Sequence, residues 1–270
     1  MPRVIITRPQ REAQRWVRDL TTLGLDTQCL PLIVIAETAQ PAQLTRAWQQ
    51  LGSYLAVMFV SGNAVTHFFS APGARAAEFA AQADLRTRAW ATGPGTAKAL
   101  LHATVAPERI DAPAADAGQF DSEALWRRVA AQVHPGERVL IVRGADTADD
   151  TGAQTGSGRP WFAEQVLAAG GVVDFVAAYQ RRAPDFSTAE HALARQAAGD
   201  GSVWLFSSAQ AVANLHTALP GQNWAAAHAL ATHPRIADAV REAGFGVVLE
   251  SRPTLPDVAA ALQQHFRTLK

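Results

Sequence analysis

The chain has 270 residues, 48% of them hydrophobic, which suits about two domains with a sizeable core. Its 24 basic and 24 acidic residues give a formal net charge of zero, which argues against a protein that binds the backbone of a nucleic acid. Cys29 is the single cysteine, which excludes an intrachain disulfide and a zinc site built from several cysteines.

Short apolar strands alternate with amphipathic helices along the chain. The first expected strand, at 4–7, follows the N-terminus directly, without the charged and long apolar segments of a targeting signal. Other apolar runs are far shorter than the roughly 20 residues of a membrane helix. We therefore expect a cytoplasmic protein without a membrane segment.

The other elements continue this alternation. A helix should end at Gly24, and further helices should begin near Gln40, Asn63, Thr96 and Asp121. Strands or extended segments are expected at 27–35, 55–60, 90–92, 139–142 and 172–179, and further elements at 162–169, 188–198, 203–206, 209–215, 236–243, 247–249 and 257–269. Repeated strand–helix–strand units predict an α/β fold with parallel sheets and helices on both faces.

The chain also carries an internal repeat. WATGPGTAKAL at 90–100 returns 140 residues later as LATHPRIADAV at 230–240, with five identical positions. A similar pair, FVSGNAV at 59–65 and FSSAQAV at 206–212, precedes it in the same order. Two copies are too few for a solenoid. They predict two similar lobes, and lobes that face each other would form a cleft.

One segment, 145–158, is polar and rich in glycine, without apolar periodicity. We expect a loop after the strand at 139–142. It is either a tolerated surface insertion or a lid at the carboxyl edge of the sheet.

Three hydroxyl side chains follow apolar strands and precede helices, namely Ser61, Thr96 and Ser208. Ligands of open parallel sheets bind at the carboxyl ends of the strands, where such turns lie. Each hydroxyl is either a helix cap or, together with the free amides beside it, part of an anion site.

Arg8 and Arg143 each follow a predicted strand directly, so we expect both at carboxyl ends of strands. There they either bind ligand carboxylates in a fork or form salt bridges that shape the loop. Tyr179 closes an extended run and either donates a proton or packs.

Standard motifs of other chemistries do not occur. Gly93-Pro-Gly95 lacks the third glycine of a dinucleotide fingerprint, and neither a phosphate-loop lysine motif nor a nucleophile elbow is present. The eight histidines lack metal-ligand spacing, so no metal is expected. His233 stands out because it replaces Gly93 in the second copy of the repeat.

Taken together, an ordered set of short motifs resembles uroporphyrinogen-III synthases over nearly the whole chain. The motifs are IITRP (5–9), LPLI (30–33), FVSGNAV (59–65), TGPGTA (92–97), SEAL (122–125), VRG (142–144), VAAYQR (176–181), FSSAQAV (206–212) and PRIA (234–237).

The resemblance implies two flavodoxin-like or Rossmann-like lobes joined by a two-stranded connector. One lobe would comprise 1–36 and 181–270, and the inserted lobe 39–175, with connectors near 33–38 and 175–182. It also implies a monomer without cofactor or metal.

The implied reaction is the closure of hydroxymethylbilane, a linear tetrapyrrole, to uroporphyrinogen III, with inversion of the terminal ring and loss of water. The preceding enzyme of the pathway would hand over this substrate. Such chemistry needs a protein that holds a flexible polyanion in reacting geometry.

Only some functional positions of the synthase family have a matching residue in this sequence. The tyrosine proposed to assist departure of the hydroxyl matches Tyr179, and Thr96, Ser61 and Ser208 match hydroxyl positions. In the second copy Ile236 replaces a threonine found in some members, so Arg235 would take over anion contact there.

Two other readings remain open. A two-lobed protein of this kind could be a non-catalytic binding or regulatory protein for a small ligand, although no effector module is evident. An enzyme of nucleotide sugars or nicotinamide should instead show a glycine fingerprint with an acidic ribose anchor, and neither is convincing.

Overall fold

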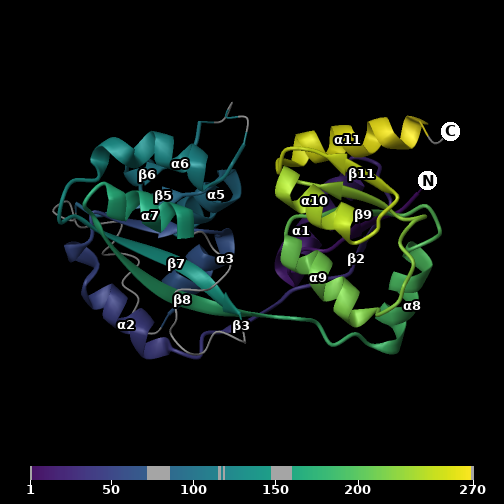
Figure 1. The fold of residues 1–270 in the computed structure, drawn as a ribbon, viewed down its shortest axis with the longest axis horizontal. Helices are drawn as coiled ribbons and strands as arrows, with labels where there is room; N and C mark the ends of the chain where they lie inside the picture. Colours follow the sequence, from purple (N-terminus) through teal and green to yellow (C-terminus); the bar gives the residue numbers. More distant parts are fainter. Residues whose placement is uncertain (1, 72–85, 115–116, 118, 147–159, 269–270) are drawn as a thin grey trace. The chain divides into compact units, whose positions relative to one another are not determined.

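The computed structural model describes residues 2–71, 86–114, 117, 119–146 and 160–268. Contacts between Cα atoms divide the chain into two compact units. Unit one contains the described residues up to Ile35 and from Arg182 onward, and unit two contains those of the segment Ala36–Arg181. The α/β fold of the prediction is confirmed in both units (Figure 1).

Unit one is built on a five-stranded sheet in the order β11-β10-β9-β1-β2, with every neighbouring pair parallel. Its strands are β1 (Val4–Ile6), β2 (Thr27–Cys29), β9 (Val203–Phe206), β10 (His228–Ala231) and β11 (Val247–Glu250). Its helices are α1 (Gln10–Thr22), α8 (Thr188–Ala197), α9 (Ala209–Ala218), α10 (Pro234–Glu242) and α11 (Leu255–Thr268).

Side chains of unit one alternate between two apolar layers, as the period of a β-strand requires. Val4 and Ile6 face a layer that includes Trp16 of α1 and Leu262 of α11. Ile5, between them in sequence, faces the opposite layer, to which α8, α9 and α10 contribute. Both faces of the sheet are therefore covered by helices, which explains why its central strands β1 and β9 are apolar and buried throughout.

Unit two is built on a six-stranded sheet in the order β3-β8-β7-β4-β5-β6. Its strands are β3 (Val34–Glu37), β4 (Ala56–Phe59), β5 (Arg88–Ala91), β6 (Ile110–Asp111), β7 (Arg138–Asp146) and β8 (Val172–Arg182). Its described helices are α2 (Pro41–Gln49), α3 (Gly62–Phe69), α5 (Pro94–His102), α6 (Ser122–Val129) and α7 (Pro160–Ala168), and 3-10 turns occupy Leu51–Ser53, Pro107–Arg109 and Ala130–Gln132.

The core of unit two again has two layers. Met58 and Trp90 pack with Phe162 of α7 and Leu125 of α6 on one face. On the other, Phe59 contacts Phe68 of α3 edge to face, with ring centroids 5.5 Å apart. Within the part of the chain that the structure describes, no helix is both long and apolar enough to cross a membrane.

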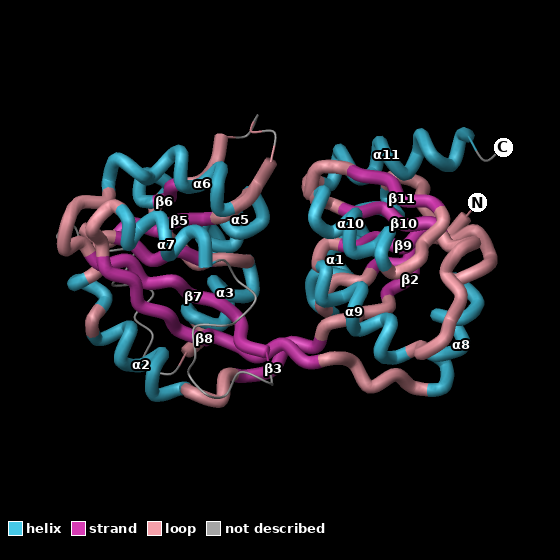
Figure 2. The backbone as a smooth tube through the Cα atoms, in the orientation of Figure 1, coloured by secondary structure: helices cyan, strands magenta, loops and turns pink. Residues whose placement is uncertain are grey.

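Three of the predicted extended segments differ from the structure. The segment 27–35 contains two strands, β2 and β3, which belong to different sheets. The strand at 139–142 extends to Asp146, and the one at 172–179 extends to Arg182; the two run side by side in Figure 2. Ala145 and Asp146 are therefore strand rather than loop, because they pair with Gln180 and Arg181. The remainder of the predicted loop, 147–158, lies outside the described residues.

Candidate active site

Tyr179 lies on β8, where the regular pairing with β7 is interrupted. Arg143 pairs with Ala177, but the next residue, Gly144, pairs with Tyr179, so Ala178 is an extra residue in β8. Such a bulge bends the strand and redirects the side chains that follow it. The Tyr179 side chain is buried, with 4% of its surface exposed.

The ring of Tyr179 passes directly over the backbone of β7. A Cβ atom at position 144 would lie 2.6 Å from both Cε2 and Cζ of the phenol and 3.0 Å from its oxygen. Real Cβ atoms essentially never come this close. Gly144 is therefore the residue that makes room for Tyr179.

The phenol oxygen of Tyr179 lies 3.2 Å from Oγ of Ser61, a hydrogen-bonding distance. Ser61 follows β4 and is the N-cap of α3, where its Oγ accepts the backbone N–H of Ala64 at 3.2 Å. His67, in the last turn of α3, has its ring centroid 5.5 Å from that of Tyr179. The first and last turns of α3 thus meet β7 and β8 at one place.

The turn that carries Thr96 adjoins the turn that carries Ser61. β4 and β5 are parallel neighbours, and Phe59 is paired with Ala91 near their carboxyl ends. A Cβ atom at Gly62 would lie 3.7 Å from the carbonyl oxygen of Gly95. The structure therefore brings Tyr179, Ser61 and Thr96 to the same edge of the sheet.

Thr96 does not cap its helix, so the predicted helix start was wrong. Helix α5 begins at Pro94, with Gly93 as its N-cap, and the N–H of Thr96 donates to the carbonyl of Gly93 at 3.1 Å. Proline is favoured at the first position of a helix, since its φ is already helical and the missing N–H has no partner there. Thr96 is instead the third helical residue, with a buried side chain.

Unit one carries the second set of predicted residues, at the carboxyl ends of β1, β9 and β10. Ser208 occupies the N-cap position of α9, but its side chain makes no capping bond within the described part of the chain. His233 caps α10, because its Nδ1 accepts the backbone N–H of Arg235 at 3.1 Å. The side chain of Arg235 is exposed, and Ile236, at the position of Thr96 in the repeat, is buried.

Arg8 forms a salt bridge, which was one of the two alternatives predicted for it, the other being the binding of ligand carboxylates. Its Nη1 lies 3.3 Å from Oε2 of Glu12, one turn along α1, and its guanidinium lies 4.3 Å from the ring centroid of Trp16. Burial lowers the pKa of Arg8, whereas Glu12 acts in the opposite direction. Arginine keeps its charge in proteins even where burial lowers its pKa, so Arg8 remains a cation beside Glu12.

Arg143 does not follow its strand, so this prediction was wrong. It lies within β7, because pairing with β8 continues to Asp146. Its guanidinium carbon lies 5.1 Å from the ring centroid of Phe175 on the neighbouring strand, which is within the range of a cation–π contact.

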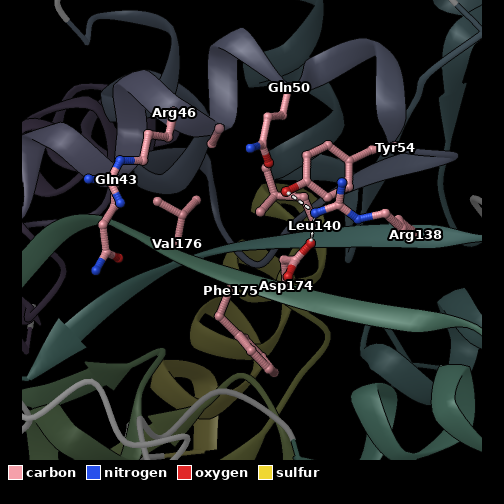
Figure 3. A pocket seen from close by; sticks show the side chains of 10 residues that line it. Gln43, Arg46, Gln50, Tyr54, Arg138, Leu140, Asp174, Phe175 and Val176 are labelled. Atoms are coloured by element: carbon pink, nitrogen blue, oxygen red, sulfur yellow. Dashed lines mark hydrogen bonds and ion pairs between the residues drawn. The ribbon is translucent and has the colours of Figure 1, made fainter.

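A pocket of about 300 Å³ lies elsewhere in unit two, between α2 and the strands β7 and β8 (Figure 3). Arg138, the first residue of β7, donates to Asp174 at 2.5 Å and to the hydroxyl of Tyr54 at 3.4 Å. Figure 3 shows Arg46 and Gln43 apart from this cluster. No residue of the pocket was a predicted site residue. Arg138 begins β7, and Gly144, the partner of Tyr179, lies six residues further along the same strand. The cluster around Arg138 is therefore roughly 20 Å from Tyr179 along the sheet.

The pocket cluster has the character of a structural ion pair. Burial raises the pKa of Tyr54 to about 12, and Asp174 adds to the rise. The hydrogen bond to Asp174 raises the pKa of Arg138. The raised pKa makes the Tyr54 phenol a weaker acid than an ordinary tyrosine, and the Arg138 guanidinium stays charged, so neither group is poised for proton transfer at neutral pH.

Sequence reasoning missed Gly144 and His67 as neighbours of Tyr179. Gly144 ends the VRG motif, so the sequence offered a signal that it lies near the site. That it makes room for the Tyr179 ring depends on the bulge in β8. Among the described residues, no group of three or more His, Cys, Asp or Glu side chains could hold a metal ion.

Comparison with known proteins agrees with this architecture. The family model described as uroporphyrinogen-III synthase HemD matches residues 14–260. A mutant uroporphyrinogen III synthase of the thermophilic bacterium Thermus thermophilus is similar over 100% of this chain and 99% of its own, with 20% identity and a TM-score of 0.57. The Helicobacter pylori enzyme is similar over 99% and 100%, with 15% identity and a TM-score of 0.58. The structural likeness shows the shared fold, and the family model, which spans most of the sequence, shows that this chain belongs to the uroporphyrinogen-III synthase family.

Proposed function

We propose how this chain carries out the reaction of its family, in which hydroxymethylbilane is cyclised to uroporphyrinogen III. Tyr179 is the proposed proton donor. It gives its hydrogen to the terminal hydroxyl of the substrate, which leaves as water while the pyrrole supplies the electrons. The observation that supports this role is the buried phenol of Tyr179, held 3.2 Å from Ser61 at the edge of the sheet.

The substrate carries acetate and propionate arms, so the protein must bind several carboxylates. We assign this binding to Thr96 in unit two and to Ser208, His233 and Arg235 in unit one, each at a turn that begins a helix. Amide groups at helix N-termini and hydroxyls beside them bind anions without an overall basic charge. This agrees with a formal net charge of zero.

The two arginines have different places in this proposal. Arg8 is held by Glu12, so any substrate carboxylate would have to share its guanidinium with that residue. Arg143 lies beside Phe175 within a strand. We keep both as candidates for carboxylate contact, and rank them below the residues at the helix starts.

The remaining parts of the proposal concern the setting of the enzyme. We propose a cytoplasmic monomer that needs no cofactor and receives its substrate from the preceding enzyme of the pathway. Domain limits of 1–36 with 181–270 and of 39–175 belong to the same proposal.

The isomer of the product tests the function directly. Freshly generated hydroxymethylbilane closes spontaneously to the type I isomer, without inversion of the last ring. Type III product that depends on the protein supports the proposal. If only type I product forms, the reading as a non-catalytic binding protein is favoured instead.

A further inference from the structure

The hydroxyl groups of Ser61 and Tyr179 lie within hydrogen-bonding distance, and by geometry either could be the donor. The Ser61 oxygen already accepts the N–H of Ala64 at 3.2 Å. Its own hydrogen remains to be donated, and the Tyr179 oxygen lies at 3.2 Å. A hydroxyl provides one donor and two acceptor lone pairs, so Ser61 can do both at once.

We propose that Ser61 is a positioning residue that donates its hydroxyl hydrogen to the Tyr179 oxygen, so that the hydrogen of the phenol is presented to the substrate. The inference rests on the proposed role of Tyr179 as proton donor. It assigns Ser61 a role through Tyr179 in place of the direct substrate contact expected from the sequence.

The proton balance explains why this arrangement favours the reaction. When the Tyr179 O–H bond breaks, its proton joins the departing hydroxyl as water, and a phenolate remains. Ring closure later releases a proton from a pyrrole carbon, which restores the phenol. Between these steps Ser61 donates a charge-assisted hydrogen bond to the phenolate, and such bonds are roughly twice as strong as neutral ones. The positive end of α3, which Ser61 caps, acts in the same direction.

The surroundings keep Tyr179 in one position. The ring lies against the backbone of Gly144 on β7, and its side chain is almost fully buried. The titratable side chain that faces it from α3 is His67, with ring centroids 5.5 Å apart. A fixed donor needs no reorganisation at the moment of proton transfer, which is the advantage of a preorganised site.

A double-mutant cycle tests this inference. Ser61→Ala should lower kcat about tenfold, because one charge-assisted hydrogen bond is lost, with KM changed less than about twofold. The same change in a Tyr179→Phe background should cause no further loss, since a residue that acts through another is silent once the other is gone. Ser61→Thr keeps the hydroxyl and should restore most of the rate.

Loss of the helix cap must be separated from loss of the donor. Ser187 provides the matched control, because it caps α8 with the same side chain and contacts Glu190 rather than Tyr179. Ser187→Ala should destabilise the protein about as much as Ser61→Ala and leave turnover unchanged.

A second readout follows the phenol itself. The chain has two tyrosines, so in a Tyr54→Phe variant labelled with 13C-tyrosine, the NMR titration reports Tyr179 alone. Ser61→Ala should move its titration midpoint to higher pH by about one unit. The same titration of His67→Asn shows whether the neighbouring imidazole contributes; a midpoint that responds to His67→Asn but not to Ser61→Ala would overturn the inference.

The remaining outcomes separate this inference from the proposed function. If Tyr179→Phe lowers kcat and Ser61→Ala lowers it further in the double mutant, Tyr179 keeps its role and the inference about Ser61 is overturned. A rise in KM with unchanged kcat would also overturn it, in favour of direct substrate binding. If Tyr179→Phe leaves turnover unchanged, the proton-donor proposal itself fails.

Discussion

Gly144 and Tyr179 are cross-strand partners at a bulge, and the phenol ring occupies the space that a side chain at position 144 would need. Gly144→Ala should therefore displace Tyr179 and lower activity strongly. It should also destabilise the protein by about 1–3 kcal/mol, the usual cost of overpacking. Turnover and urea unfolding measure the two effects.

Gly199→Ala is the matched control for this substitution. No described atom outside its immediate neighbours lies within 4 Å of a Cβ built there, and its φ is not in the left-handed region. The control should keep full activity and near-native stability. If Gly144→Ala behaved like Gly199→Ala, the close approach of Tyr179 to β7 would have no functional meaning.

Thr96→Ala distinguishes a ligand-binding hydroxyl from a helix cap. A true cap such as Asp121, whose Oδ1 accepts the N–H of Ala124 at 2.9 Å, should cost about 1 kcal/mol when changed to alanine. Thr96 is not a cap, so its substitution removes no capping bond, and activity should fall severalfold while the protein stays folded. Comparable activity in Thr96→Ala and the unmodified protein would remove Thr96 from the site.

Stability should fall in mild acid because of a histidine pair in unit one. His228 Nδ1 and His265 Nε2 lie 3.0 Å apart, and burial together with His228 lowers the pKa of His265. The unfolded chain therefore binds a proton at higher pH than the folded one, so stability is lost as pH falls through about 6.5, the ordinary histidine value. Urea unfolding at several pH values should show this slope, and His265→Gln should reduce it; an equal slope in the variant would contradict the assignment.

The pocket around Arg138 should not take part in the reaction. Arg138 is paired with Asp174 near the amino end of β7, far along the sheet from Tyr179. Arg138→Ala should leave kcat and KM for type III formation within about twofold, because Arg138 lies far from Tyr179. The protein should also stay folded, since an ion pair this exposed contributes at most about 1 kcal/mol to stability. A large rise in KM would instead show that the pocket binds substrate.

Several parts of the fold and the site could be predicted because they depend on local chemistry. The α/β alternation follows from the spacing of apolar residues, and Ser61 precedes a helix after a buried strand in the way an N-cap does. The start of α5 also has a local signal, since Pro94 suits the first helical position and Gly93 the cap, whereas the predicted start was Thr96.

Other features depend on pairing between distant segments. The register shift between β7 and β8 decides that Arg143 lies within a strand and that Gly144 faces Tyr179. The contact between Ser61 and Tyr179 joins residues 118 positions apart. Bulges and contacts of this kind arise from tertiary packing, and a single sequence carries little trace of them.

The most direct test of the account is the isomer composition of the product, measured for the unmodified protein and for Tyr179→Phe. The protein should be given freshly generated hydroxymethylbilane, and the oxidised products separated into type I and type III porphyrins. The unmodified protein should form mainly type III product, and a Tyr179→Phe variant of nearly unchanged stability should form it severalfold more slowly. Type I product alone from the unmodified protein would contradict it.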